Sequence, residues 1–151
     1  LSAGVAYRYQ DAARGVTDDN GDFSWTDDYG YHLRLGTGAP SPGFLGWGSL
    51  DLDWARTSGN GNRIDTAGAL YIERVPIGPL RIGVGLGSFY SDVHLGDTRD
   101  KNWTIGGTAT VSLDLFGPLY IEGGYNLTSL FKDKTAGLKT DYVFLDLGFK
   151  F

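Results

Sequence analysis

Apolar and polar side chains alternate one by one along most of this chain, which is the period of a β-strand and not of a helix. The alternation is clearest at the C-terminal end, where one face carries Val143, Leu145, Leu147, Phe149 and Phe151. The opposite face there carries Tyr142, Phe144, Asp146, Gly148 and Lys150. Similar segments recur through the sequence and predict eight strands, over residues 1–10, 25–37, 44–56, 63–75, 80–91, 102–115, 119–130 and 142–151.

Two kinds of connection alternate strictly between these segments. Short connections at 38–43, 76–79 and 116–118 contain all five Pro residues, and a Pro at a turn costs no ladder hydrogen bond. Longer connections rich in Asp, Asn, Gly, Thr and Lys cover 11–24, 57–62, 93–101 and 131–137. Up-and-down connectivity places tight turns on one rim and loops on the other. We therefore expect an all-β, eight-stranded antiparallel up-and-down barrel, forming a single domain over residues 1–151.

Alternation alone leaves open whether the apolar face points outward, as in a membrane barrel, or inward, as in a soluble lipocalin-like barrel. Three observations favour an apolar outer face. The polar face interleaves charges with Gly and Ala, which suits a crowded lumen. The strands are about ten to thirteen residues long, enough to cross a bilayer when tilted. Aromatic residues gather near the strand ends of the apolar face, as in membrane barrels: Tyr7, Tyr9, Tyr29, Trp54, Tyr90, Trp103, Phe149 and Phe151.

The strand at 63–75 fits this scheme least well. Its apolar residues Ile64, Leu70 and Ile72 are expected on the lipid face, but Tyr71 and Val75 then fall on the polar face.

Composition adds a few constraints. The mean hydropathy of −0.19 is slightly polar, which a membrane barrel permits because only alternate residues meet lipid. A run of about 18 apolar residues, the mark of a transmembrane helix, does not occur. The net charge of −5 without a basic patch in the sequence argues against nucleic-acid binding. The chain has no Cys, so a disulfide and a thiolate metal site are both excluded.

The C-terminal pattern Val143-x-Leu145-x-Leu147-x-Phe149-x-Phe151 resembles the terminal signature of bacterial outer-membrane proteins. At the level of pattern, the whole chain resembles the small eight-stranded barrels of the OmpA, OmpX and opacity-protein type. The resemblance implies a bacterial outer-membrane location, contact with outer-membrane lipid, and recognition of the last strand, ending at Phe151, by the barrel-insertion machinery. It also implies periplasmic termini and loops outside the cell. It implies no single activity, since family members include structural anchors, adhesins, lipid-modifying enzymes and narrow pores.

The polar face predicts a charged lumen, in which buried charges must pair or form hydrogen bonds. Asp28, His32 and Asp65 lie on this face. Glu73 and Arg81 flank the turn at 76–79 and are expected to form an ion pair. A salt-bridged plug is the favoured interpretation, and a narrow cation-favouring path is the alternative, because acids outnumber bases. The predicted luminal charge network comprises Arg8, Arg34, Asp51, Asp53, Glu73, Arg81, Asp114, Glu122, Asp146 and Lys150.

A catalytic site is a further alternative. Lipid A-modifying barrels such as PagP and PagL use His with Ser and a carboxylate, which must lie within hydrogen-bond reach of one another. Ser88, Ser91 and Asp92 lie close to His94 in sequence, but Ser88 falls on the predicted lipid face. His32 is expected in the polar plug. We therefore expect no enzymatic activity.

Two short motifs are given ordinary interpretations. Residues 18–22 resemble part of a calcium loop but lack EF-hand spacing, so a solvated acidic loop is expected. Asn126-Leu127-Thr128 matches a glycosylation sequon but lies in a predicted strand. The sequence thus predicts no metal or cofactor site, and favours a monomeric barrel with a structural or surface-interaction role.

Overall fold

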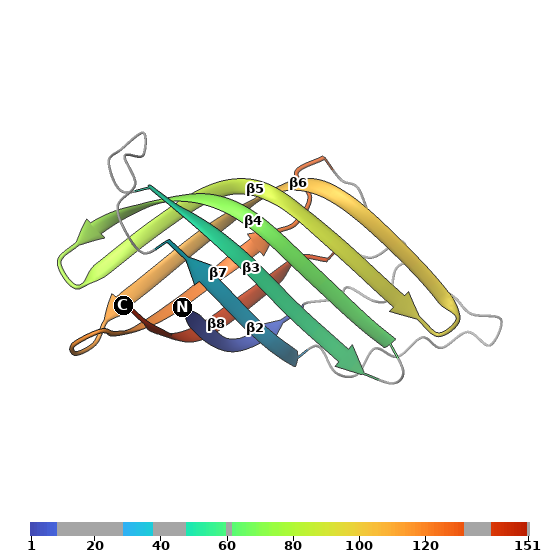
Figure 1. The fold of residues 1–151 in the computed structure, drawn as a ribbon, viewed down its shortest axis with the longest axis horizontal. Coiled ribbons are helices and arrows are strands. Elements are labelled where there is room, and N and C mark those ends of the chain that lie inside the picture. The colour runs from blue at the N-terminus through green and yellow to red at the C-terminus, as the bar shows by residue number, and fades with distance from the viewer. Residues whose placement is uncertain (9–28, 38–47, 60–61, 132–139, 151) are drawn as a thin grey trace.

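The computed structural model describes residues 1–8, 29–37, 48–59, 62–131 and 140–150, and it shows a closed barrel. Each strand pairs antiparallel with its neighbour in sequence, and β1 pairs with β8 to close the wall (Figure 1). The predicted eight-stranded up-and-down barrel is therefore confirmed. No helix among the described residues is long and apolar enough to cross a membrane. The strands are β1 Ser2–Tyr7, β2 Tyr29–Gly36, β3 Gly48–Gly59, β4 Asn62–Ile77, β5 Leu80–Leu95, β6 Thr98–Asp114, β7 Leu119–Leu127 and β8 Tyr142–Phe149.

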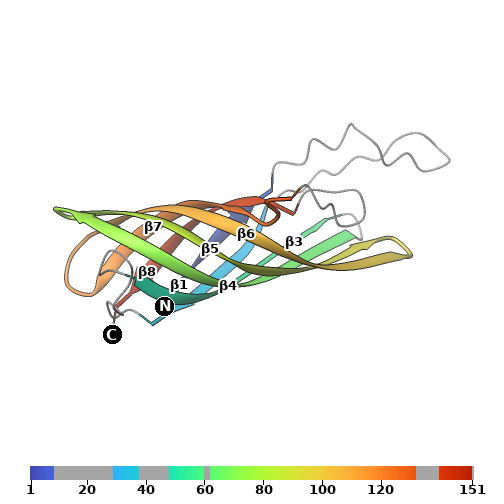
Figure 2. The same ribbon diagram turned by 90° about the horizontal axis from the view of Figure 1, so that it is seen from above.

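The two ends of the barrel differ in what they carry. Both chain ends lie at one end, together with the β4–β5 and β6–β7 turns, as Figures 1 and 2 show. We call this end the turn rim. Gly78 and Gly117 occupy its turns with φ of +62° and +57°, a conformation that Gly adopts without steric cost. The β5–β6 turn, with Gly96 at φ +56°, lies at the opposite end, which we call the far rim.

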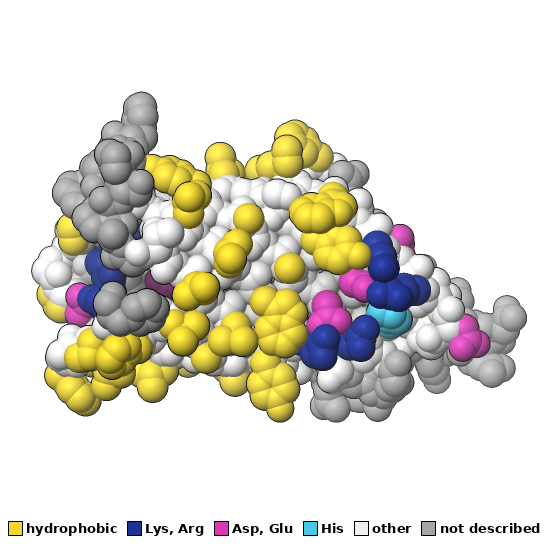
Figure 3. Space-filling model, viewed as in Figure 1, with side chains coloured by type: hydrophobic (Ala, Val, Ile, Leu, Met, Phe, Trp, Pro, Cys, Tyr) yellow, Lys and Arg dark blue, Asp and Glu magenta, His cyan; other side chains and the backbone are white. Residues whose placement is uncertain are grey.

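The wall separates an apolar outer face from a largely polar inner face. Along β8, Tyr142, Phe144 and Asp146 are buried, whereas the intervening Val143 and Leu145 are exposed. Figure 3 shows hydrophobic side chains spread over the middle of the visible face. The prediction of an apolar outer face is confirmed for seven of the strands by exposed residues such as Val5, Leu33, Leu35, Leu50, Leu52, Ile82, Val84, Leu86, Ile105, Val111, Ile121, Tyr125, Val143, Leu145 and Leu147.

Strand β4 has the opposite orientation to the predicted one. Ile64, Leu70 and Ile72 are buried inside the barrel, and Tyr71 and Val75 point outward. The reason lies on the neighbouring strand β5, where three successive inward positions are Gly83, Gly85 and Gly87. A Cβ at Gly85 would lie only 2.9 Å from Cγ1 of Ile72, so the isoleucine occupies space that a side chain on β5 would need.

Two of the expected loops are mostly strand. β3 continues to Gly59 and β4 starts at Asn62, within the predicted loop 57–62. β5 and β6 likewise extend to Leu95 and from Thr98, within the predicted loop 93–101. Polar composition misled the prediction here, because charged side chains on these extensions pair across strands, as opposite charges on one sheet face do.

The proline at position 76 also departs from expectation. The sequence predicts a turn at this position, but β4 runs through Pro76 to Ile77, and Pro76 lies opposite Arg81. The strand ends one residue later, so Pro76 occupies a strand terminus, where a missing N–H disturbs little of the ladder.

Candidate functional site

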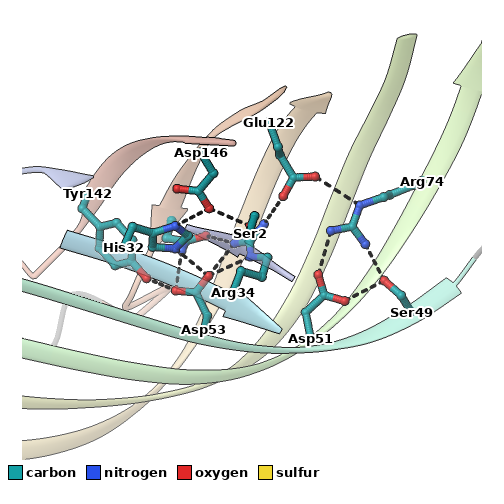
Figure 4. A network of polar contacts seen from close by, with 11 residues as sticks. Ser2, His32, Arg34, Ser49, Asp51, Asp53, Arg74, Glu122, Tyr142 and Asp146 are labelled. Atoms are coloured by element: carbon teal, nitrogen blue, oxygen red, sulfur yellow. Dashed lines mark hydrogen bonds and ion pairs between the residues drawn. The ribbon is translucent and has the colours of Figure 1, made fainter. Parts of the chain in front are cut away.

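A polar network crosses the lumen of the barrel (Figure 4). Its members occupy inward positions of six different strands, and all of them are buried except Arg74, whose side chain is 15% exposed. They are Ser2 on β1, His32 and Arg34 on β2, Ser49, Asp51 and Asp53 on β3, Arg74 on β4, Glu122 and Asn126 on β7, and Tyr142 and Asp146 on β8.

His32 lies between two carboxylates. Its Nδ1 is 2.7 Å from Oδ2 of Asp146, and its Nε2 is 2.9 Å from Oδ2 of Asp53. Ser2 donates a hydrogen bond of 2.8 Å to the same oxygen of Asp146. Both ring nitrogens are therefore engaged by acids, and the Ser2 hydroxyl contacts a carboxylate and not the imidazole. The geometry differs from that of a Ser–His–acid triad, in which the serine contacts the histidine.

Asp53 is the centre of the network. Its Oδ2 lies 2.7 Å from Nη2 of Arg34 and 2.8 Å from Nε of the same guanidinium. Its Oδ1 accepts hydrogen bonds from Tyr142 Oη and from Nδ2 of Asn126, the latter at 3.1 Å. Arg34 then extends across the lumen to Glu122 on β7, with 2.9 Å between Nη1 and Oε1. One buried ion pair thus links β2 to β7, two strands that are not neighbours in the wall.

Arg74 continues the network toward the turn rim. Its Nη2 lies 2.7 Å from Oδ2 of Asp51, and its Nε lies 3.5 Å from Oε2 of Glu122. It also donates to the Ser49 hydroxyl, which in turn donates to Asp51 at 2.8 Å. Arg74 was missed in the sequence because β4 was assigned the wrong inner face. One feature of the sequence could have revealed the error. Arg74 lies two residues after Ile72 and four after Leu70, so a charged residue shared the face that was predicted to contact lipid.

Arg8 forms a second buried cluster. Its guanidinium donates to the Thr57 hydroxyl at 2.9 Å, to the Thr66 hydroxyl at 3.0 Å and to the Thr140 carbonyl. The same guanidinium carbon lies 4.8 Å from the centre of the Tyr142 ring. Hydroxyl and carbonyl oxygens therefore satisfy a charge that is completely buried.

Aromatic rings fill the space around these polar groups. Phe144 stacks on His32 with 4.3 Å between ring centroids, and the guanidinium of Arg34 lies 4.5 Å from the Phe144 centroid. Phe89 lies between two glycines, since a Cβ at Gly68 or at Gly106 would come within 2.8 Å of its ring. The glycines of the inner face thus make room for large rings, which lie in the lumen beside the ion pairs.

Among the residues of the predicted luminal network, Glu73 has the wrong orientation. Glu73 is on the outward-facing register of β4, opposite Gly48 and Val84, and it accepts a 2.5 Å hydrogen bond from Tyr71. The predicted Glu73–Arg81 ion pair is therefore wrong, for the same reason that the β4 faces were inverted.

Arg81 instead belongs to a small cluster at the turn rim. Its Nη2 and the Lys150 Nζ each lie 2.6 Å from Oδ1 of Asp114. These side chains are partly exposed, unlike the deeper network. Asp65 was expected in the lumen but lies on the outer face with Arg56 and Arg63, and Asp28 falls outside the described residues.

The alternative catalytic residues are not brought together. Ser91 faces the lumen and donates to the Thr140 hydroxyl at 3.1 Å, whereas His94 lies on the outer face, 3.4 Å from Asp92. Ser88 also points outward, as expected.

The described residues contain no cluster of His, Cys, Asp and Glu that could hold a metal ion. Residues 18–22 of the calcium-like motif lie outside the described part, and the sequon residue Asn126 is buried in the network.

Comparison with known proteins defines the fold. No family model and no curated protein matches the sequence. The fold is similar to the crystal structure of Neisserial surface protein A, with a TM-score of 0.57 at 16% sequence identity, over 99% of this chain and 95% of that one. A likeness at this level of identity concerns the fold alone. It supports the closed eight-stranded antiparallel barrel that the sequence predicts.

Proposed function

We propose that this chain is a bacterial outer-membrane barrel with a sealed lumen, which acts as a structural or surface-interaction protein. The observation that carries the proposal is the contrast between the two faces of the wall. Inside, ion pairs and rings bridge opposite strands; outside, the middle of the barrel is apolar.

The outer face supports the membrane placement. Soluble monomers rarely expose large continuous apolar patches, whereas membrane barrels carry an apolar band flanked by aromatic residues. Here the Tyr7–Tyr29 and Tyr90–Trp103 ring pairs, each with 5.0 Å between centroids, lie toward the far rim. Exposed Phe116, in the β6–β7 turn, and exposed Phe149, at the end of β8, lie toward the turn rim. Amphipathic rings at both ends of an apolar band are the arrangement expected at two membrane interfaces.

The packed lumen supports a plug rather than a channel. In the described network, four carboxylates face two guanidinium groups and one imidazole, which would favour a cation over an anion. A cation entering the lumen would meet the ion pairs of Arg34 with Asp53 and Glu122, and the Phe144 ring that covers Arg34. The same engagement of His32 by two acids supports a non-enzymatic role.

Orientation follows from the resemblance to small outer-membrane barrels. We place the turn rim, with both termini, in the periplasm, and the far rim outside the cell. We also propose that the chain is monomeric and that the insertion machinery recognises its last strand, which ends at Phe151.

Conductance in a planar bilayer tests the sealed lumen. The wild-type barrel should give no regular current steps, whereas Arg34→Ser combined with Phe144→Ser should open a path and give cation-selective steps. Leu145→Ser, on the adjacent outward position, is the matched control and should stay silent. A folded band on unheated gels verifies each variant. Regular cation-selective steps from the wild type would overturn the plug and favour the narrow channel.

Cysteine labelling tests the orientation, because the chain has no cysteine of its own. A membrane-impermeant maleimide added to intact cells should label Asp97→Cys in the β5–β6 turn. It should label Phe116→Cys in the β6–β7 turn only after the outer membrane is opened. The reverse result would place the termini outside the cell.

A further inference from the structure

The outer face of the barrel changes character near the far rim. The extensions of β3, β4, β5 and β6 carry charged side chains on positions that, nearer the middle, are apolar. Arg56, for example, follows Leu52 and Trp54 on the outward positions of β3. Figure 3 shows basic, acidic and histidine side chains gathered toward one end of the visible face, beyond the hydrophobic band. We call this set the outer charged belt: Arg56, Arg63, Asp65, Asp92, His94, Arg99 and Lys101.

Cations are in excess within the belt. Asp65 contacts two arginines, at 2.5 Å from Nε of Arg56 and 2.8 Å from Nε of Arg63. Asp92 contacts Arg99 at 2.6 Å and lies opposite Lys101. With neutral histidine, three arginines and one lysine against two aspartates leave a net charge of +2 (4 − 2). This local charge is opposite in sign to the net charge of −5 of the whole chain.

The arginines retain hydrogen-bonding capacity. The side chains of Arg56, Arg63 and Arg99 are 42%, 41% and 50% exposed. A guanidinium carries five N–H donors, and Arg56 and Arg63 each contact Asp65 through Nε. The acids thus hold the guanidinium groups in place at the surface while donors remain for a further anion. Forked donors of this kind match the geometry of phosphate oxygens.

The aromatic residues locate the belt relative to a bilayer. The guanidinium carbon of Arg56 lies 5.3 Å from the centre of the Trp54 ring. Tyr90 and Trp103 pair on the outer face, and Asp92 and Lys101 are the next outward pair toward the far rim. Interfacial Trp and Tyr sit at headgroup level, and two residues of strand add roughly 7 Å. The belt therefore lies at the depth of the lipid phosphates.

We propose that the outer charged belt binds the phosphate groups of anionic lipid headgroups in the leaflet at the far rim. The inference rests on the proposed membrane placement and adds to it a defined lipid chemistry and its residues. Anionic headgroups attract clustered basic residues at a membrane surface, and the excess charge of the belt is complementary to them. The two aspartates set the spacing of the arginines, and the aromatic rings beneath them sit at the inner edge of the headgroup layer.

Native mass spectrometry of the folded barrel in neutral detergent tests this proposal. The probes are phosphatidic acid and diacylglycerol with the same acyl chains, which differ by the phosphate. We expect the wild type to bind phosphatidic acid in preference to diacylglycerol. Arg56→Gln with Arg63→Gln should weaken phosphatidic acid binding at least about tenfold, since each surface cation contributes to attraction by an anionic lipid. The matched control, Arg81→Gln with Lys150→Gln at the turn rim, removes the same charge and should have a much smaller effect.

Three outcomes would overturn the proposal: no preference for phosphatidic acid in the wild type, an equal loss in both double variants, or displacement of the lipid by an equal concentration of inorganic phosphate. A separate measurement distinguishes failure of the membrane placement. If the wild-type chain does not form a folded, heat-sensitive band in lipid vesicles, the proposed function fails. A barrel that folds in vesicles without preferring the phosphate-bearing lipid overturns the belt alone.

Discussion

Arg34 and Asp53 lie directly opposite each other in the β2–β3 register, and their charged groups meet in the lumen with 2.7 Å between Nη2 and Oδ2. Arg34 also contacts Glu122 on β7, a strand that does not neighbour β2 or β3. A buried ion pair offsets the desolvation of its charges only where the remaining donors and acceptors are satisfied. Tyr142, Asn126 and His32 do this for Asp53, so the pair is the point at which the walls of the barrel are joined.

Replacing Arg34 with Met should destabilise the barrel by about 3–5 kcal/mol, because it leaves Asp53 and Glu122 buried without their guanidinium partner. Asp53→Asn should also lower the free energy of unfolding. The double variant should lower it by about 0.5–3 kcal/mol less than the sum of the two single effects. Urea unfolding in lipid vesicles measures all three free energies.

Leu33→Met is the matched control for this cycle, since Leu33 precedes Arg34 but points outward. It should change the free energy of unfolding by less than about 0.5 kcal/mol. Additive effects of Arg34→Met and Asp53→Asn would show that the two side chains do not interact.

Strand number and most inward positions could be predicted because period-two alternation records which side of a wall each residue faces. Of the predicted network, Arg8, Arg34, Asp53 and Asp146 are indeed buried in the lumen. Asp51 and Glu122 are buried there as well. These residues stand on strands whose other face is plainly apolar, so their orientation could be predicted without any knowledge of neighbouring strands.

On strand β4, alternation alone did not predict which face points into the barrel. Both of its faces contain apolar residues, and the choice between them depends on the cross-strand space left by glycines on β5. Register, not alternation, determines that space. The same limit explains why Arg74 was missed and why Glu73 was placed in the lumen. Partners drawn from distant strands, such as Glu122 for Arg34, depend on closure of the barrel, which local patterns do not encode.

Gly68→Ala should destabilise the barrel by about 1–3 kcal/mol, the usual cost of overpacking. A Cβ at Gly68 would lie 2.8 Å from the ring of Phe89, which is completely buried and has little room to move. Phe89→Leu should rescue the alanine variant in part by removing ring atoms. Gly123→Ala is the control, because its Cβ would meet other atoms only at 3.6 Å or more. Vesicle unfolding curves supply the comparison, and equal effects at positions 68 and 123 would contradict tight packing around Phe89.

A charge on the outer face distinguishes a membrane barrel from a water-soluble one. Leu86 is 62% exposed near the middle of β5, whereas Leu80 begins the same strand at the turn rim. In a bilayer, an Arg on the lipid face costs about 2–4 kcal/mol at the midplane and about 0–1 kcal/mol near an interface.

Leu86→Arg should therefore lower the free energy of unfolding in vesicles by about 2–4 kcal/mol, and Leu80→Arg by no more than about 1 kcal/mol. Both substitutions add the same charge to the same outer face of one strand, so only their depth differs. In a barrel surrounded by water, an exposed Leu→Arg change would have little effect at either position. Equal and small effects would thus contradict the membrane placement, whereas a penalty that increases toward the middle of β5 is explained by a hydrocarbon layer around the barrel.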